Sequence, residues 1–585
     1  MYIETVPNRG SPPAFLLRDA RRDGKKIIKR TLANLSHWPA AQIESFRALL
    51  RGERLVPAAQ AAAGLRGPAG DWIRIERSLP HGHVQAILEA IRKLGLDSLI
   101  ATKRSRERDL VLAMLVERLI HPRSKLASVR HWQDTTLADA LAVGDADVDE
   151  LYAALDWLRA RQDRIEQKLA ARHLSEQGLV FYDVSSSFYT GRTCCLARYG
   201  HDRDGKGLPI IVYGLLADAR GCPVAVQVYP GNTGDPTTVP DQAEKLRARF
   251  GLAHAVLVGD RGMLTQTQID ALKAHPGLGW ISALRSPAIR RLVDQGHLQL
   301  SLFDQQNLAE IRSPEFPAER LMACFNPLLA EQRRRKREEL LAATQRELER
   351  IAAGVARRRA RPLDAEQIGE RVGRVINRYK MAKHFEWKFE AGGLVWSRLE
   401  ESIRREAELD GIYVVRTSEP AERLSAADAV RGYKGLAQVE RAFRCLKGLD
   451  LRVRPIFHRT EEHVRAHIFL CMLAYYVEWH LRQAWTELLF EDEELPAARR
   501  VRDPVAPAKD SASAKRKKLD RKTAQGLPTH SFETLLTHLA TQTRNTCRLQ
   551  ADPTAVTFEQ VTNATPLQTR ALERLALLPV AGNTG

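Results

Sequence analysis

The chain has 585 residues, which suggests roughly three or four domains, since a domain averages about 150 residues. Its 90 Lys and Arg outnumber its 71 Asp and Glu, and the net charge of +19 favours a polyanionic partner over a small metabolite. The seven cysteines form no C-x-x-C pair, and neither a signal peptide nor an apolar run approaching the ~20 residues of a membrane span is evident. We therefore expect a cytoplasmic protein without a membrane partner.

The first part of the chain is predicted to contain two different regions. Residues 1–80 form a small mixed module whose basic stretch, RDARRDGKKIIKR (18–30), fits a DNA-contacting element and a solvated hairpin equally well. Residues 81–175 carry apolar side chains at spacings of three and four, which predicts helices. We interpret this helical region as DNA-binding.

The period then changes to that of a sheet. Three runs rich in β-branched and aromatic residues, joined by turns containing Gly and Asp, predict an antiparallel meander at 179–189, 208–218 and 223–231. Helix, strand, helix and strand follow in that order at 238–250, 254–262, 265–275 and 279–285. This order predicts an α/β fold with an RNase H-like core formed by residues 176–285 and 410–490.

Two segments interrupt or follow that core. Residues 286–409 are predicted to be an inserted subdomain with a charged helix at 330–362, which is either a solvated arm or a phosphate-contacting surface, and a strand-like piece at 384–396. A broad apolar helix at 463–489 is expected to pack behind the helix at 433–447. Residues 491–528 then read as a flexible basic linker and 529–585 as a C-terminal tail with a short helix at 531–541.

The stretch YKGLAQVERAFRCLK (433–447) has the most informative pattern. Tyr433, Glu440 and Lys447 are spaced by seven residues, so in one helix they share a face with a drift of about 20° per step. This polar row runs along the edge of an apolar stripe that must be buried. The stripe consists of Leu436, Val439, Phe443 and Leu446.

Three acids occupy positions suited to metal binding. Asp183 lies inside the first predicted strand, Asp260 closes the fourth, and Glu440 lies on the helix. Each alone has an ordinary structural explanation, such as a turn, a helix start or a surface acid. Together they suit phosphoryl transfer with two Mg²⁺ ions, which requires carboxylates that converge from different elements.

These features resemble the DDE transposases of bacterial insertion sequences, in the branch whose third-acid helix carries Tyr, two residues, Arg, three residues, Glu, six residues and Lys. Tyr433, Glu440 and Lys447 match this signature in register, whereas Leu436 stands at the Arg position. The segments YDVSSS around Asp183 and GDRGM around Asp260 also match, and the resemblance spans roughly residues 178–480.

The resemblance implies a mechanism. Asp183, Asp260 and Glu440 would bind two Mg²⁺ ions, for which Mn²⁺ would substitute; water would cut the element's end, and the released 3′-hydroxyl would attack target DNA. The implied partners are DNA, namely terminal inverted repeats and the target, and a second copy of the chain in a homodimer. A cut-and-paste pathway in a bacterial cytoplasm, with nucleoid association, is expected. The side chains expected to contact DNA are Tyr433, Lys447, Arg444 and Arg261.

Two alternatives remain open. The chain could be a catalytically silent, transposase-derived DNA-binding protein in which Leu436 marks decay, although three intact acids argue against this. It could also be a nuclease without joining activity. A zinc site is not expected, because the neighbouring candidates lack zinc-ligand spacing. Those candidates are Cys194, Cys195, His201 and Cys222.

Overall fold

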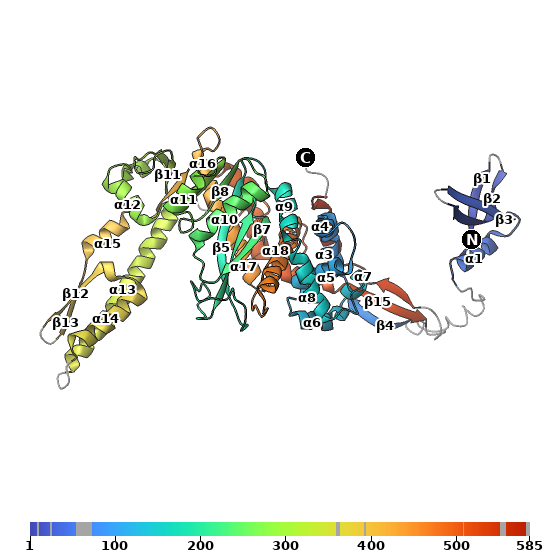
Figure 1. Cartoon of the computed structure of the whole chain (residues 1–585), viewed down its shortest axis with the longest axis horizontal. Coiled ribbons are helices and arrows are strands. Elements are labelled where there is room, and N and C mark those ends of the chain that lie inside the picture. The colour runs from blue at the N-terminus through green and yellow to red at the C-terminus, as the bar shows by residue number, and fades with distance from the viewer. Residues whose placement is uncertain are drawn as a thin grey trace. The chain divides into compact units, whose positions relative to one another are not determined.

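The computed structural model describes residues 1–8, 11–23, 26–53, 73–358, 363–390, 393–448, 450–506, 508–549 and 557–580. The chain forms two compact units. The first unit comprises Met1–Ser78 and Arg544–Thr562, and the second comprises Leu79–Thr543 and Asn563–Gly585. Each unit is built from its own sheet or sheets (Figure 1).

The first unit contains two small antiparallel sheets. Residues 18–23 and 26–30 of the basic stretch lie in the two hairpin strands of the first sheet, where Arg18 and Lys29 both pair with Glu4, at 2.7 and 3.0 Å. Part of the charge in this hairpin is therefore neutralised within the sheet. The first sheet is β1 (Tyr2–Asn8), β2 (Ser11–Asp23) and β3 (Lys26–Asn34), followed by helix α1 (Ala40–Leu50). The second sheet has the order β16 (Phe558–Val561), β15 (Thr543–Leu549) and β4 (Ile73–Pro80).

An eight-stranded mixed sheet forms the centre of the second unit. The predicted meander is confirmed: β5 (Leu179–Phe188), β6 (Ile210–Ala217) and β7 (Pro223–Pro230) pair antiparallel. On the other side of β5, the strands β8 (Ala255–Val258) and β9 (Leu278–Ala283) run parallel to it, as the alternation with helices requires. The protein is thus a mixed α/β structure.

Helices bury both faces of this sheet. Val180, Tyr182 and Val184 of β5 belong to one apolar cluster, together with residues of α10 (Val239–Glu244) and α11 (Gln266–Lys273). Phe181 of the same strand belongs to a second cluster, which includes α17 (Ala437–Lys447) and α18 (Glu461–Ala484). Because side chains alternate along a strand, Asp183 lies on the same face as Phe181, toward α17.

The predicted inserted subdomain is partly continuous with the core sheet. Strands β10 (Leu308–Ile311) and β11 (Arg320–Phe325) extend the sheet beside β14 (Ile412–Thr417), because β11 pairs with β14 along its whole length. The part after β11 has an apolar cluster of its own, whereas the cluster of the part before it also includes Ile412 and Val414 of β14. The part after β11 consists of α13 (Pro327–Arg357), α14 (Ala365–Tyr379), β12 (Phe385–Glu390), β13 (Gly393–Arg398) and α15 (Glu400–Ala407) (Figure 1).

Helix α13 confirms the predicted charged helix as far as Arg357; residues 359–362 of the prediction lie outside the described residues. Several of its arginines pair with acids of the same helix, for example Arg335 with Glu339 at 2.9 Å. Arg337 instead pairs with Asp410, at 2.6 Å, at the point where the chain returns to the sheet. Much of the charge of this helix is therefore neutralised locally, as in a solvated arm.

The helices expected at 81–175 share one apolar core with the sheet. Helices α5 (Arg106–Ile120) and α8 (Val148–Arg159) contact α18, and α9 (Gln162–His173) contacts β7. The helix predicted at 463–489 is confirmed as α18, and it packs against α17 as expected, although it ends at Ala484. The helical region is therefore part of the core of the second unit.

Residues 491–528 differ from the expected flexible linker. They contain α19 (Leu495–Val501) and α20 (Ala512–Asp520), and Val505 between them is fully buried. Lys517 is 2% exposed and donates to the carbonyls of Thr486 and Glu491, at 2.7 and 3.0 Å. These contacts anchor the segment despite its linker-like composition. In the described part of the chain, none of the helices has the length and apolar character needed to cross a bilayer.

Candidate active site

One cavity of about 490 Å³ brings the three predicted acids together. Asp183 comes from the middle of β5, Asp260 follows the end of β8, and Glu440 lies in the first turn of α17. The remaining walls come from α13, β14 and α16 (Ala426–Gly435). The other lining residues are Asn326, Leu328, Leu329, Gln332, Tyr413, Tyr433, Lys434, Leu436 and Ala437.

Strand register makes Asp183 and Asp260 neighbours. Phe181 of β5 pairs with Val258 of the parallel strand β8, and each acid follows two residues later. Residues two apart on a strand share a face, and adjacent strands lie ~4.8 Å apart. The main-chain ladder with β9 continues to Gly259, whose N–H donates to the carbonyl of Ile281 at 3.1 Å. The two carboxylates therefore occupy adjacent positions on one face of the sheet.

Glu440 reaches this face because α17 packs against β5. Val439 and Phe443 are buried, and the ring of Phe443 meets that of Tyr213 at 5.8 Å between centroids. Glu440 itself is exposed at the edge of this contact. The predicted buried stripe is confirmed, with side chains no more than 8% exposed. Its residues are Leu436, Val439, Phe443 and Leu446.

The single helix predicted over 433–447 is wrong in one respect, because two helices meet at Leu436. The N–H of Leu436 donates to the carbonyl of Tyr433, three residues back, at 3.2 Å, which is the tighter 3₁₀ spacing. Its backbone remains right-handed, with φ −53° and ψ −28°. Tyr433 therefore lies on α16, whereas Glu440 and Lys447 lie on α17.

Burial dominates the electrostatics of Asp183. It raises the pKa of this carboxyl to about 7, and the negative charges of Asp260 and Glu440 add to the increase. The N–H of Val184 donates to Oδ1 at 2.8 Å, which opposes the increase, as does the charge of Arg203. A cluster of three carboxylates that destabilise one another's charge is suited to a bound cation.

The loop after β8 fixes the orientation of Asp260. The N–H groups of Gly262 and Met263 both donate to Oδ1, at 2.9 and 2.7 Å. Among the described residues no hydrogen bond reaches Oδ2 of Asp260, so this oxygen is available to a ligand. The carboxylate thus has one oxygen that holds its position and one that can coordinate.

The four side chains expected to contact DNA occupy different surroundings. Tyr433 lines the cavity, and burial together with the charge of Asp260 raises its pKa to about 12. Lys447 lies outside the lining, 3.8 Å from Asp204, and burial lowers its pKa to about 8. Arg444 is exposed on α17, and Arg261 lines a separate cleft beside the inserted helices. Tyr433 therefore lines the cavity together with the acids, whereas the three cations lie outside its lining.

The sequence did not predict that Asp204, in the loop between β5 and β6, pairs with Lys447, one of the side chains expected to contact DNA. Its carboxylate pairs with Arg454 as well as with Lys447, and its side chain is 10% exposed. Asp202 shapes this loop by accepting from the N–H groups of Asp204 and Gly207, at 2.9 and 2.8 Å. The signal that could have indicated it is the charged, Gly-containing run HDRDGKG, which lies outside both flanking strands.

Comparison with known proteins identifies the family of this chain. The family model of the transposase DDE domain matches residues 185–477, which is half of the chain, so this chain belongs to that family. The match contains Asp260 and Glu440 and begins two residues after Asp183. Among solved structures, the cryo-EM structure of the piggyBac transposase synaptic complex with hairpin DNA is similar, with a TM-score of 0.30 and 10% identity. The similarity covers 78% of this chain and 77% of that one. No curated protein matches.

Proposed function

We propose that this chain is a metal-dependent DNA transposase that binds the ends of an insertion sequence and catalyses DNA cleavage and strand transfer by a cut-and-paste route. The observation that carries this proposal is the meeting of Asp183, Asp260 and Glu440 at one cavity. They come from two adjacent parallel strands and a facing helix. The strand order β7-β6-β5-β8-β9 supports the finer assignment of an RNase H-like core.

The three carboxylates fit hard divalent cations, because such ions take oxygen ligands. Asp183, Asp260 and Glu440 would hold two Mg²⁺ ions, or Mn²⁺ in their place. The ions would supply activation of the attacking oxygen and stabilisation of the leaving oxygen. Oδ2 of Asp260 and the exposed carboxylate of Glu440 are available for this purpose. Burial, with a smaller contribution from the charges of Asp260 and Glu440, raises the pKa of Asp183, and a bound cation would offset this cost of ionisation.

The remaining side chains would position DNA. The Tyr433 hydroxyl lies at the cavity wall, where it can donate to a phosphate oxygen. Lys447, Arg444 and Arg261 surround the acids with positive charge suited to the flanking phosphates. The proposed DNA is the element's terminal inverted repeats and a target site. We expect two copies of the chain to act together in the bacterial cytoplasm, because two ends must be joined.

A nicking assay on labelled element ends tests the catalytic assignment. With Mg²⁺, we expect Asp183→Asn, Asp260→Asn and Glu440→Gln each to lower cleavage by on the order of 10³-fold, because each removes a metal-binding charge. Asp270→Asn is the matched control, since this exposed acid of α11 pairs with Lys273 and does not line the cavity. Cleavage by wild type no faster than by Asp183→Asn would contradict the proposal and favour a silent DNA-binding protein.

Strand transfer separates a transposase from a nuclease without joining activity. Ends cut in advance, with free 3′-hydroxyls, are supplied with a supercoiled target plasmid and Mg²⁺. We expect joined products with wild type and none with Glu440→Gln. Cleavage of intact ends without any joining of the cut ends would support the nuclease instead.

A further inference from the structure

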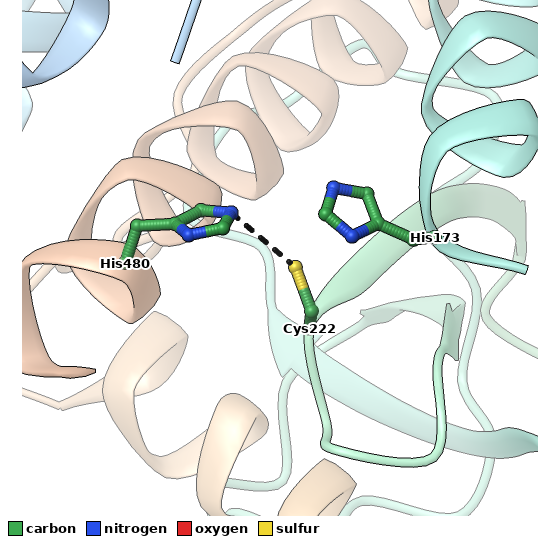
Figure 2. Close-up of side chains that lie close together, drawn as sticks. All are labelled: His173, Cys222 and His480. Carbon is green, nitrogen blue, oxygen red and sulfur yellow. Dashed lines mark hydrogen bonds between the residues drawn. The ribbon is translucent and has the colours of Figure 1, made fainter. Parts of the chain in front are cut away.

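Three side chains of the metal-ligating type meet far from the acidic cavity. His173 is the last residue of α9, Cys222 lies in the turn between β6 and β7, and His480 belongs to α18. Figure 2 shows the three side chains pointing toward one another. One ligand atom of each lies within 4.8 Å of those of the other two. Cys222 and His480 are buried, and the side chain of His173 is 4% exposed.

The spacing of these atoms suits a tetrahedral metal. Cys222 Sγ lies 3.8 Å from His480 Nε2 (Figure 2). In a zinc site with bonds of ~2.05 Å to nitrogen and ~2.3 Å to sulfur, the tetrahedral angle places these two atoms about 3.6 Å apart. The pair therefore needs to move only slightly to share a metal.

Hydrogen bonds orient the ring of His173. Its Nε2 lies 3.0 Å from the hydroxyl of Tyr476, while its Nδ1 lies 3.2 Å from Nη2 of Arg220. A guanidinium can only donate, so Nδ1 carries a lone pair and the ring proton is on Nε2. Fixing one ring nitrogen so that the other can coordinate is the arrangement around metal-ligating histidines.

We propose that His173 Nδ1, Cys222 Sγ and His480 Nε2 bind one Zn²⁺ ion in a structural site that is separate from the acidic cavity. A nitrogen and sulfur ligand set selects zinc, whereas the oxygen set of the cavity selects Mg²⁺. We assign the fourth position to Asp218, whose Oδ2 lies 3.9 Å from His173 Nδ1 and which would move toward the other two ligands on binding. Zinc would tie α9, the β6–β7 turn and α18 together.

The charges around the cluster set the conditions for binding. Burial keeps both imidazoles neutral, lowering the pKa of His173 to about 4 and that of His480 well below its ordinary value. Burial also raises the pKa of the Cys222 thiol, so zinc must displace its proton to bind. Arg220 now pairs with Asp218 at 2.7 Å, but its side chain is 61% exposed and can turn outward to free that carboxylate.

A second cysteine and histidine pair shows why proximity alone is insufficient. Cys471 Sγ is also 3.8 Å from His467 Nε2, but that nitrogen donates to the carbonyl of Val453 at 2.9 Å and has no lone pair for a metal. The cluster of Cys445, Asp450 and Glu478 is likewise filled by the guanidinium of Arg482, 2.7 Å from Glu478. Of the clusters in the described part of the chain, the one around Cys222 combines three ligand atoms with a ring nitrogen whose lone pair faces a movable donor, Arg220.

Metal analysis of the full chain tests this site. We expect one zinc per chain after gel filtration, and after exchange with Co²⁺ the tetrahedral d–d bands with a thiolate-to-cobalt charge-transfer band. Cys222→Ser and His480→Gln should abolish the thiolate band and the bound zinc. Cys471→Ser, which removes an equally buried thiol beside a histidine, should keep both, and so should Asp183→Asn, which disables the acidic cavity.

The wild-type chain decides the matter even if a variant does not fold. No zinc at equimolar supply and no thiolate band with Co²⁺ would overturn the proposal. Retention of the band by folded Cys222→Ser, or its loss from folded Cys471→Ser, would overturn it as well. With zinc bound, removal by a chelator should lower the thermal unfolding temperature of wild type, and an unchanged temperature would contradict a structural role.

Discussion

At the scale of single residues, the candidate site depends on where three carboxylates are placed. Asp183 and Asp260 follow the paired residues Phe181 and Val258 by the same two positions. Their proximity is therefore set by strand register, and a slip of one residue would turn one of them to the opposite face. Burial raises the pKa of Asp183, so in the absence of metal the negative charge of this carboxylate destabilises the folded protein.

This destabilisation predicts a pH-dependent stabilisation by Asp183→Asn. The pKa of Asp183 rises from 3.8 to about 7, so its stabilising contribution is complete below pH ~4 and is lost as the pH rises through 7. An amide cannot ionise, so in Mg²⁺-free buffer the variant should unfold at a higher temperature than wild type at pH 8, and the difference should shrink as the pH falls toward 4. The gain is at most about 4 kcal/mol, since one pKa unit corresponds to ~1.4 kcal/mol.

The control for this experiment is Asp270→Asn. Hydrogen bonds from Gln266 and Lys273 lower the pKa of Asp270, so removing its charge should give no stabilisation at pH 8. Saturating Mg²⁺ should also close the gap between wild type and Asp183→Asn, because only wild type keeps the full ligand set. Equal unfolding temperatures of these two proteins at pH 8 without Mg²⁺ would show that Asp183 is not destabilised by its surroundings.

At the scale of elements, the contact between α16–α17 and β5 brings Glu440 to the other acids. Gly435, the last residue of α16, lies so close to the ring of Phe181 that a Cβ atom would be 2.3 Å from Cζ. Phe181 is 2% exposed and cannot easily move aside. The absence of a side chain at position 435 therefore sets how closely the helix pair approaches the strand that carries Asp183.

Gly435→Ala should consequently impair catalysis without altering any acid. The added methyl must push the helix pair away from β5, and a displacement near 1 Å at a reacting centre lowers rates by on the order of 100-fold. The nicking assay measures this loss, and circular dichroism checks that the fold persists. Gly373→Ala in α14 is the matched control, because nothing lies within 4 Å of the added Cβ and alanine favours a helix. Equal cleavage by the two variants would mean that this contact does not position Glu440.

At the scale of the whole molecule, the net charge of +19 is the excess of 90 Lys and Arg over 71 Asp and Glu. Many cations are already paired, as in α13, where Arg335 meets Glu339. Arg444 differs, because no carboxylate in the described part of the chain lies within ion-pairing distance of it. Fewer cations are therefore unpaired and able to contact DNA than the 90 Lys and Arg of the composition, and Arg444 on α17 is one of them.

Salt dependence of DNA affinity distinguishes these two kinds of arginine. The logarithm of the binding constant should fall linearly with the logarithm of salt concentration, with a slope set by the number of phosphates contacted. Arg444→Ala should reduce the magnitude of that slope by about 1. Arg335→Ala removes an equal charge from a paired, exposed position and should leave the slope unchanged. Identical slopes for wild type and Arg444→Ala would exclude a phosphate contact by Arg444.

The local sequence pattern was sufficient to predict those elements whose structure depends on neighbouring residues. The strands β5, β6 and β7, the parallel strands after them and the buried stripe of α17 all appear where periodicity predicts them. The helix break at Leu436 was not predictable, because its apolar side chain continues the stripe while its backbone turns more tightly. Strands β10 and β11 lie within the predicted insert, but β11 pairs with β14, which follows the insert in the sequence. Pairing between such distant segments cannot be predicted from the local sequence pattern.

The sequence by itself determined the family of this protein, the order of its core elements and the three acids proposed for catalysis, because these depend on residue type, spacing and period. Only the tertiary structure decided what those residues meet: Tyr433 on its own helix at the cavity, Lys447 beside Asp204, and residues 491–528 anchored by Lys517. It also brought together His173, Cys222 and His480, which are widely separated along the chain. The physical reason is that contacts between distant segments arise from packing and register, whereas sequence pattern reports on neighbours.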